Sequence, residues 1–174
     1  MKSFITAAFA CLFLSTSFAQ HKGHAPSKAG SAKTKATFSQ ALNHYFAVKD
    51  ALVATNGIEA HKHAVKLVAA FKNMNMASMP SKQHAVFMKL QKDILFDAEH
   101  VAETKDAGHQ RDHFGDLSKN MIAVRKAANN PKQPAYVQYC PMKKVSWLST
   151  AKSIKNPYYG SEMLTCGEVT ETIK

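Results

Sequence analysis

Two short stretches near the C-terminal end of the 174-residue sequence combine a thiol with a thioether. Cys140 precedes Met142 by two residues, and Met163 precedes Cys166 by three. Thiolate and thioether sulfurs are soft ligands that select Cu(I) above all, with Ag(I) or Zn(II) as alternatives. The spacing differs from the CxxC pairs typical of zinc sites. These four residues are therefore the main candidates for a metal site.

Histidines and methionines elsewhere supply further candidate ligands. His109 and His113 are four residues apart and share one face of a predicted helix, with His100 across the hairpin from them. Three imidazoles so placed could bind Zn or Cu, whereas the alternative is that they are solvated on a polar face. Three more candidates share one loop with the pattern M-x-M-x-x-M: Met74, Met76 and Met79. Their thioethers could converge on Cu(I), or they could fill gaps at the end of a helical bundle.

The first residues of the chain indicate export. Lys2, the apolar run over residues 4–14 and the small-x-small site at residues 17–19 are typical of a secretory signal peptide over residues 1–19. Residues 20–36 are rich in Lys, Ser and Ala without apolar periodicity, which predicts a flexible tether. We therefore expect a periplasmic protein with no transmembrane segment after signal cleavage.

Export also favours a second interpretation of the cysteines. Two cysteines in an exported protein are most often joined as a disulfide. A Cys140–Cys166 bridge would close a loop of about 25 residues and would stabilise the fold by roughly 3–4 kcal/mol on the chain-entropy estimate. Spacing alone leaves both interpretations open, because a pair that cycles between thiols and disulfide binds metal only when reduced.

Charge and motifs argue against other classes of function. The formal net charge of +11 comes from 21 Lys and two Arg against 12 acidic residues, whereas proteins that read bases or clamp phosphates favour Arg. Together with export, this composition argues against a nucleic-acid partner. The sequence also lacks a Gly-rich phosphate loop, a nucleophile elbow and an HExxH motif. We therefore expect that the protein is not an enzyme.

The hydrophobic pattern predicts four amphipathic helices between residues 37 and 130. Thr37 followed by Gln40 fits a capping box at the start of the first helix. Asn56-Gly57 is expected to end that helix, because both residues tolerate a left-handed conformation. A further N-cap is expected at Asp106, at the start of the fourth helix. Short connections between helices of similar length predict an antiparallel four-helix bundle, and hence a mainly α fold.

The last part of the chain, residues 131–174, has a different character. It holds both of these cysteines, the only Trp and four of the five Tyr, and no helical stripe survives beyond a single turn around Leu148. Residues 136–139 and 168–173 alternate enough to form short strands that could pair as a two-stranded hairpin. We expect an otherwise irregular segment that lies against the bundle, within a single domain over residues 37–174.

Several strings of this segment resemble one known family. They are YCPM at 139–142, WLS at 147–149, NPYYG at 156–160 and MLTCG at 163–167. The upstream string YFAVKDALV at 45–53 is similar to the helical part of the same family, as are Gln110-Arg111, Phe114 and Leu117-Ser118. On these residues the chain, from about residue 38 to the C-terminus, resembles the domain of unknown function 3347 family.

The resemblance implies a role in metal handling. Members of that family are exported proteins, found alone or fused to periplasmic adaptors of heavy-metal efflux pumps. It therefore implies a helper in copper or silver resistance, with an efflux adaptor or pump component as partner and with Cys140, Met142, Met163 and Cys166 as the ligands. The expected function is capture or transfer of Cu(I). The alternative is a structural or partner-docking bundle whose tail is locked by the disulfide.

Overall fold

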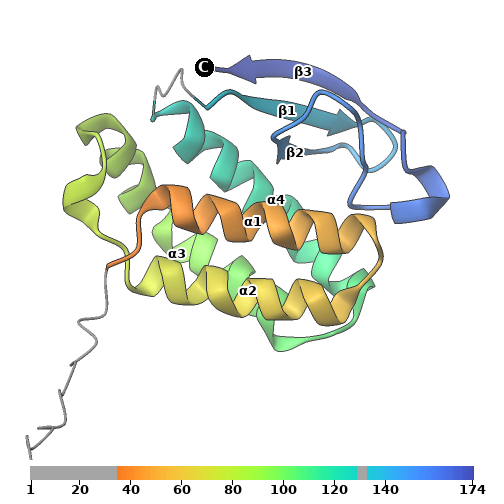
Figure 1. Cartoon of the computed structure of the whole chain (residues 1–174), viewed down its shortest axis with the longest axis horizontal. Coiled ribbons are helices and arrows are strands. Elements are labelled where there is room, and N and C mark those ends of the chain that lie inside the picture. Colours follow the sequence, from red (N-terminus) through yellow and green to blue (C-terminus); the bar gives the residue numbers. More distant parts are fainter. Residues whose placement is uncertain (1–34, 129–132) are drawn as a thin grey trace, which may run out of the picture. The chain divides into compact units, whose positions relative to one another are not determined.

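The computed structural model describes residues 35–128 and 133–174, so the predicted signal peptide over 1–19 and nearly all of the predicted tether over 20–36 lie outside the described residues. Over this part the chain is mainly helical, with four α-helices followed by a small three-stranded antiparallel sheet (Figure 1). None of the helices so described combines the length and the apolar character that a membrane span requires.

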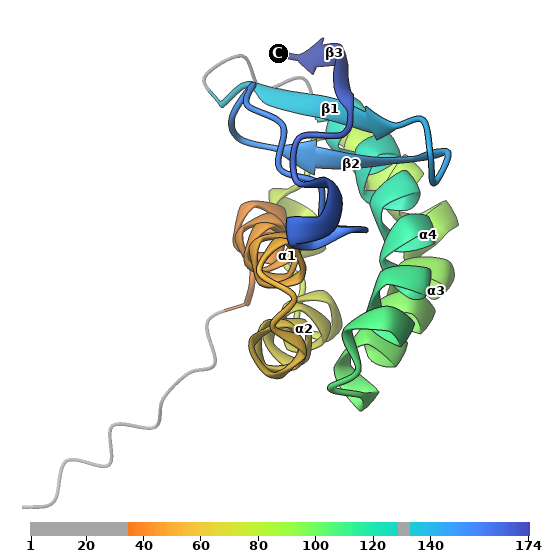
Figure 2. The ribbon, with the colours of Figure 1, turned by 90° about the vertical axis from the view of Figure 1, so that its right-hand side faces the viewer.

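Each helix packs against the next one in the chain. The helices are α1 (Phe38–Val53), α2 (Gly57–Lys72), α3 (Ser81–Glu103) and α4 (Ala107–Lys126), with a short 3-10 turn, η1 (Met76–Ser78), between α2 and α3. Their apolar stripes meet in one core, in which Phe71, Phe87 and Phe114 are almost completely buried. Helix α4 also packs against a strand of the sheet, which lies over α1 and α4 (Figure 2).

Local capping signals set two of the helix starts, as predicted. The backbone N–H of Gln40 donates to Thr37 Oγ1 (3.3 Å), and the N–H of Thr37 donates to Gln40 Oε1 (2.8 Å), so the capping box is confirmed. Asp106 caps α4 by accepting from the N–H of His109 (2.7 Å). Each bond satisfies a donor that the first helical turn would otherwise leave unpaired.

The prediction that Asn56-Gly57 ends the first helix is wrong. Helix α1 ends at Val53, and the left-handed residue after it is Thr55, with φ 54°. Asn56 instead caps α2, its side chain accepting from the N–H of Glu59 (3.1 Å). Gly57 begins α2 because a Cβ there would lie only 1.9 Å from the carbonyl oxygen of Lys105. Both residues therefore serve the start of the second helix.

The sheet has β1 (Ala135–Cys140) at its centre, between β2 (Val145–Ser149) and β3 (Glu168–Ile173). The expected pairing of the segments at 136–139 and 168–173 is confirmed, with Tyr136 opposite Thr172. The expected two-stranded hairpin is corrected to three strands, because β2 replaces the single turn predicted around Leu148. Trp147 and Leu148 are both fully buried, so β2 lacks the alternation that marks a half-buried strand.

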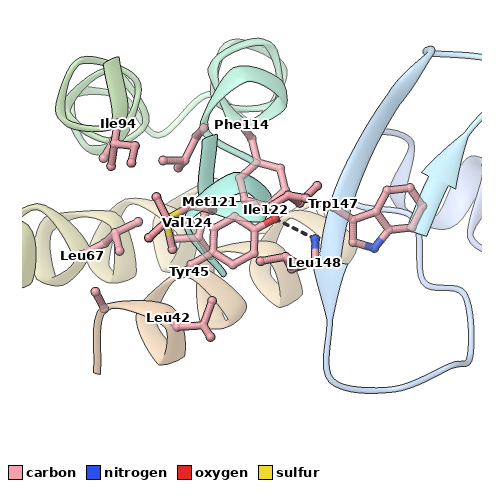
Figure 3. Packing of buried hydrophobic residues seen from close by; sticks show 14 of the residues in the cluster. Leu42, Tyr45, Leu67, Ile94, Phe114, Met121, Ile122, Val124, Trp147 and Leu148 are labelled. Carbon is pink, nitrogen blue, oxygen red and sulfur yellow. Dashed lines mark hydrogen bonds between the residues drawn. The ribbon is translucent and has the colours of Figure 1, made fainter. Parts of the chain in front are cut away.

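The hydroxyl of Tyr45 joins three elements in the core (Figure 3). Tyr45 of α1 is fully buried, and its hydroxyl lies 2.7 Å from Ser118 Oγ of α4 while accepting from the N–H of Leu148 in β2 (3.1 Å). Its ring stacks on Phe114, with 5.1 Å between the centroids. Burial raises the pKa of Tyr45 well above its ordinary value, so the hydroxyl stays neutral.

Removing that hydroxyl should destabilise the whole fold. In Tyr45→Phe the buried Leu148 N–H and Ser118 hydroxyl lose a partner, which should lower the free energy of unfolding by about 1–3 kcal/mol. Urea denaturation followed by circular dichroism measures the change. The control is Tyr136→Phe on the half-buried face of β1, which should change it by less than about 0.5 kcal/mol. An unchanged urea midpoint for Tyr45→Phe would contradict this role of the hydroxyl.

Two glycine-to-alanine substitutions should have opposite effects. Gly57→Ala places a methyl group against the Lys105 carbonyl and should cost about 2–3 kcal/mol of stability, although alanine is the better helix former. Gly115→Ala, within α4, meets only Val145 Cγ1 at an ordinary 3.5 Å and should stabilise by about 0.5–1 kcal/mol. Thermal unfolding of both variants tests the pair, and a Gly57→Ala protein as stable as Gly115→Ala would refute the close approach.

Candidate metal centre

Strand pairing brings the two predicted cysteines together. Cys140 is the last residue of β1 and is fully buried, whereas Cys166 is half-buried just before β3. Tyr139 pairs with Glu168 across the β1–β3 ladder, which carries Cys166 back to the end of β1. Both cysteines are free thiols, and they lie close enough for Cys140 to raise the pKa of Cys166. The backbone N–H of Lys143 also points at Cys140 Sγ (3.5 Å).

The neighbouring sulfur makes Cys166 a weaker acid. Its pKa is raised, first by partial removal from water and then by the charge and the hydrogen bond of Cys140. Two thiolates side by side repel each other, so the second proton is held more tightly than usual. A bound cation would reverse this effect, because its charge stabilises both thiolates.

A buried asparagine fixes the backbone at Cys166. Asn156 Nδ2 donates to the carbonyl of Cys166 (2.8 Å), and Asn156 Oδ1 accepts from the N–H of Tyr158 (2.8 Å). The N–H of Asn156 donates to the carbonyl of Leu164 (2.8 Å). Residues 157–159 form a turn, and Asn156, which directly precedes it, holds the backbone of Cys166 in place.

Glycine is required immediately after Cys166. Gly167 has a φ of 148°, and a Cβ there would lie 2.8 Å from the carbonyl oxygen of Tyr139 and 3.0 Å from Trp147 Cη2. The chain can therefore approach β1 this closely only without a side chain at position 167. This close approach lets Cys166 lie beside Cys140.

Arg111 of α4 ties the same turn to the helices. Its Nε donates to the carbonyl of Pro157 (2.8 Å), and its Nη2 donates to the carbonyl of Leu52 (3.0 Å) and to Thr55 Oγ1 (2.8 Å). Partial burial lowers the pKa of Arg111, but a guanidinium remains charged. The loop that carries Cys166 is thus anchored to α1 and α4.

The two methionines next to the cysteines remain at the surface. Met142 lies in the turn between β1 and β2 and is 61% exposed, and Met163 ends η2 (Gly160–Met163) and is 39% exposed. The N–H of Cys166 donates to the carbonyl of Met163 (3.1 Å). The structure therefore brings the thiols together and leaves the two thioethers on the turns that border them.

The three methionines of the loop after α2 belong to the hydrophobic core. Met74 and Met79 are buried, and Met76 packs against the same core. Met74 is further held by backbone bridging to Ala36. These positions match the packing alternative, in which flexible methionine side chains fill irregular gaps.

The three predicted histidines lie side by side where α3 meets α4. The His113 ring centroid is 4.3 Å from that of His100 and 5.0 Å from that of His109. The rings of His100 and His113 are stacked, whereas His109 meets His113 edge-on. Across the described ranges no three His, Cys, Asp or Glu side chains already surround a point where an ion could sit. The three rings are therefore neighbours without being a preformed metal site.

Sequence reasoning missed Asp97, which lies beside this trio. Asp97 Oδ1 is 3.1 Å from His113 Nδ1, and the carboxylate is buried. Burial raises the pKa of Asp97, while its hydrogen bond with His113 opposes the shift. Asp97 precedes His100 by three residues in a predicted helix, so the shared face was a signal that could have found it.

Comparison with known proteins gives one match. A family model described as a protein of unknown function (DUF3347) matches residues 41–133, which is more than half of the chain. The matched range covers most of α1 and all of α2, α3 and α4, and it ends before β1, so the strings around Cys140 and Cys166 lie outside it. Neither the curated proteins nor the solved structures yielded a match.

The unequal burial of the two cysteines predicts an order of chemical modification. In the reduced, folded protein Cys166 should react first with iodoacetamide, and Cys140 should react only in denaturant. Because the pKa of Cys166 is raised, its thiolate fraction and its alkylation rate should keep increasing with pH beyond the range of an ordinary thiol. Peptide mapping by mass spectrometry measures both rates. Equal labelling of the two residues in the folded state would contradict the structure.

Proposed function

Since the chain belongs to the family described as a protein of unknown function (DUF3347), we propose that it is a periplasmic heavy-metal-binding protein that captures or transfers Cu(I). In this proposal Cys140 and Cys166 are the primary ligands, with Met142 and Met163 as additional ones. The protein is not an enzyme, it serves metal efflux or resistance, and its partner is an efflux adaptor or pump component.

The single observation that carries the proposal is the pair of adjacent free thiols between β1 and β3. Cu(I) favours thiolate and thioether sulfur and accepts low coordination numbers, so two sulfurs suffice to hold it. Cys140 supplies a buried ligand and Cys166 an accessible one. A thioether from either flanking turn could then complete the site.

The electrostatics of the pair support uptake of a cation. Because the pKa of Cys166 is raised, its thiol retains the proton at neutral pH and would release it when an ion binds. Binding should therefore be coupled to proton release and should strengthen as pH rises. The framework of Asn156, Gly167 and Arg111 holds the sulfurs in place before the ion arrives.

The four helices serve as a scaffold in this proposal. Helices that are adjacent in the chain pack together, and the connections between them are short. These two features support the antiparallel four-helix bundle expected from the sequence. Periplasmic location is supported by the signal-peptide pattern of residues 1–19.

The second candidate function is a structural or partner-docking bundle whose C-terminal segment is locked by a Cys140–Cys166 disulfide. The same adjacency of the two thiols favours it, because little movement would be needed to join them. The two functions require different oxidation states of Cys140 and Cys166: metal binding needs free thiols, whereas the structural function needs the disulfide.

Anaerobic Cu(I) titration against a chromophoric chelator tests the metal site. The reduced protein should bind one Cu(I), and Cys140→Ser combined with Cys166→Ser should abolish tight binding. Met142→Leu or Met163→Leu should weaken affinity by about 10-fold, as expected for the loss of a supplementary soft ligand. The matched control is Met88→Leu, since Met88 is an exposed methionine on α3 outside the site. Binding that survives in the double cysteine variant would refute the proposal.

The disulfide alternative predicts a different outcome. Protein purified from the periplasm without reductant should then be two hydrogens lighter than its reduced form, and it should contain no copper. Free thiols together with co-purified copper would instead favour the metal-binding function.

A further inference from the structure

We infer that the junction of α3 and α4 carries a second metal site, separate from the cysteine pair, that takes a divalent transition-metal ion of the imidazole-binding class. Its primary ligands are the Nε2 atoms of His100 and His113, and His109 is the third donor. Zn(II) and Cu(II) are suitable probe ions for this imidazole site, whereas the sulfur site is suited to Cu(I).

The two principal histidines come from different helices. His100 lies in the last turn of α3 and His113 in the second turn of α4, and their rings are 4.3 Å apart between centroids. Both are half-buried, so their positions are restricted before any ion binds. His109 is exposed, one helical turn before His113, with 5.0 Å between the two ring centroids.

Hydrogen bonds assign the free nitrogen of each ring. His100 Nδ1 is 2.9 Å from the carbonyl oxygen of Phe96, and a carbonyl can only accept, so Nδ1 carries the proton. His113 Nδ1 is 3.1 Å from the carboxylate of Asp97, which likewise accepts when ionised. Both rings therefore present Nε2 as a lone-pair donor, which is the form that binds metals.

This pattern is the usual outer support of a metal-binding histidine. Ligating imidazoles almost always donate their second N–H to a carboxylate or a backbone carbonyl. Asp97 supplies the carboxylate for His113, and its side chain is only 8% exposed. A buried carboxylate hydrogen-bonded to one imidazole nitrogen favours the tautomer in which the opposite nitrogen is free to bind a metal.

To bind one ion together, the rings of His100 and His113 would have to turn from this arrangement. The planes of His100 and His113 differ by 28°, so their Nε2 lone pairs run side by side instead of meeting at one point. The torsion that turns a histidine ring is soft, and a bound ion needs both nitrogens about 2.0–2.1 Å away. His109, being exposed, can turn towards the same point from α4.

The site is distinct from the cysteine pair. His113 faces Asp97 of α3, whereas Asp112 and Gly115 of α4 face the turn and strand that follow Cys140, where Lys143 and Val145 lie. The two sites therefore lie on different faces of α4, and they differ in donor chemistry. Substitutions that remove the cysteine pair should therefore leave the histidine site intact.

Calorimetric titration with Zn(II) of the full chain carrying Cys140→Ser and Cys166→Ser tests the inference without thiol ligands. We expect one Zn(II) per chain. His100→Gln combined with His113→Gln should reduce affinity at least 100-fold. Asp97→Asn should reduce it about 10- to 100-fold while both ligands remain, as is usual for outer-shell partners. His84→Gln, elsewhere on α3, is the matched control and should leave affinity unchanged.

Cu(II) electron paramagnetic resonance of the same protein supplies an independent readout. Hyperfine splitting from at least two imidazole nitrogens is expected, and it should be lost in the His100/His113 double variant. Two results would overturn the inference. One is Zn(II) binding that disappears with His21→Gln and His24→Gln near the N-terminus. The other is binding unchanged in the His100/His113 variant with its circular dichroism intact.

Discussion

The fold depends on a single buried hydroxyl, that of Tyr45, which links the helices to the sheet. A buried hydroxyl or N–H without a partner costs more than its hydrogen bond contributes, so burial of the Tyr45 and Ser118 hydroxyls and the Leu148 N–H favours the arrangement in which they meet. This requirement sets where β2 lies on α1 and α4. Since β2 pairs with β1 and β1 with β3, it also sets where the two cysteines come together.

Local signals predicted the helical half of the chain well. The caps at Thr37 and Asp106 each involve residues three apart, so the sequence contains all the information that they need. Asn56-Gly57 was assigned to the wrong helix, because its role depends on the close approach of Lys105. Strand β2 was missed for a related reason, since Trp147 and Leu148 are both buried by packing against distant elements.

The same distinction between local signals and contacts with distant elements applies to the candidate sites. Residue type and spacing identified the cysteines and the histidines, and strand alternation predicted the pairing that brings Cys166 to β1. The contacts that Asn156 and Arg111 make were not predicted, because both side chains act on backbone atoms remote in sequence. The spacing of Met74, Met76 and Met79 allowed a Cu(I) site, but their burial assigns these methionines to the hydrophobic core.

Because Cys140 is more deeply buried than Cys166, the two sulfurs are reached from solvent in a fixed order. An ion or a reagent from solvent meets the half-buried sulfur first and reaches the fully buried one only afterwards. In the proposed function a departing ion would leave the outer sulfur first, because an incoming ligand could displace that sulfur while the inner one still held the ion. If the proposed function holds, exchange at the pair would proceed through an intermediate that shares the ion, without release of a free ion into water.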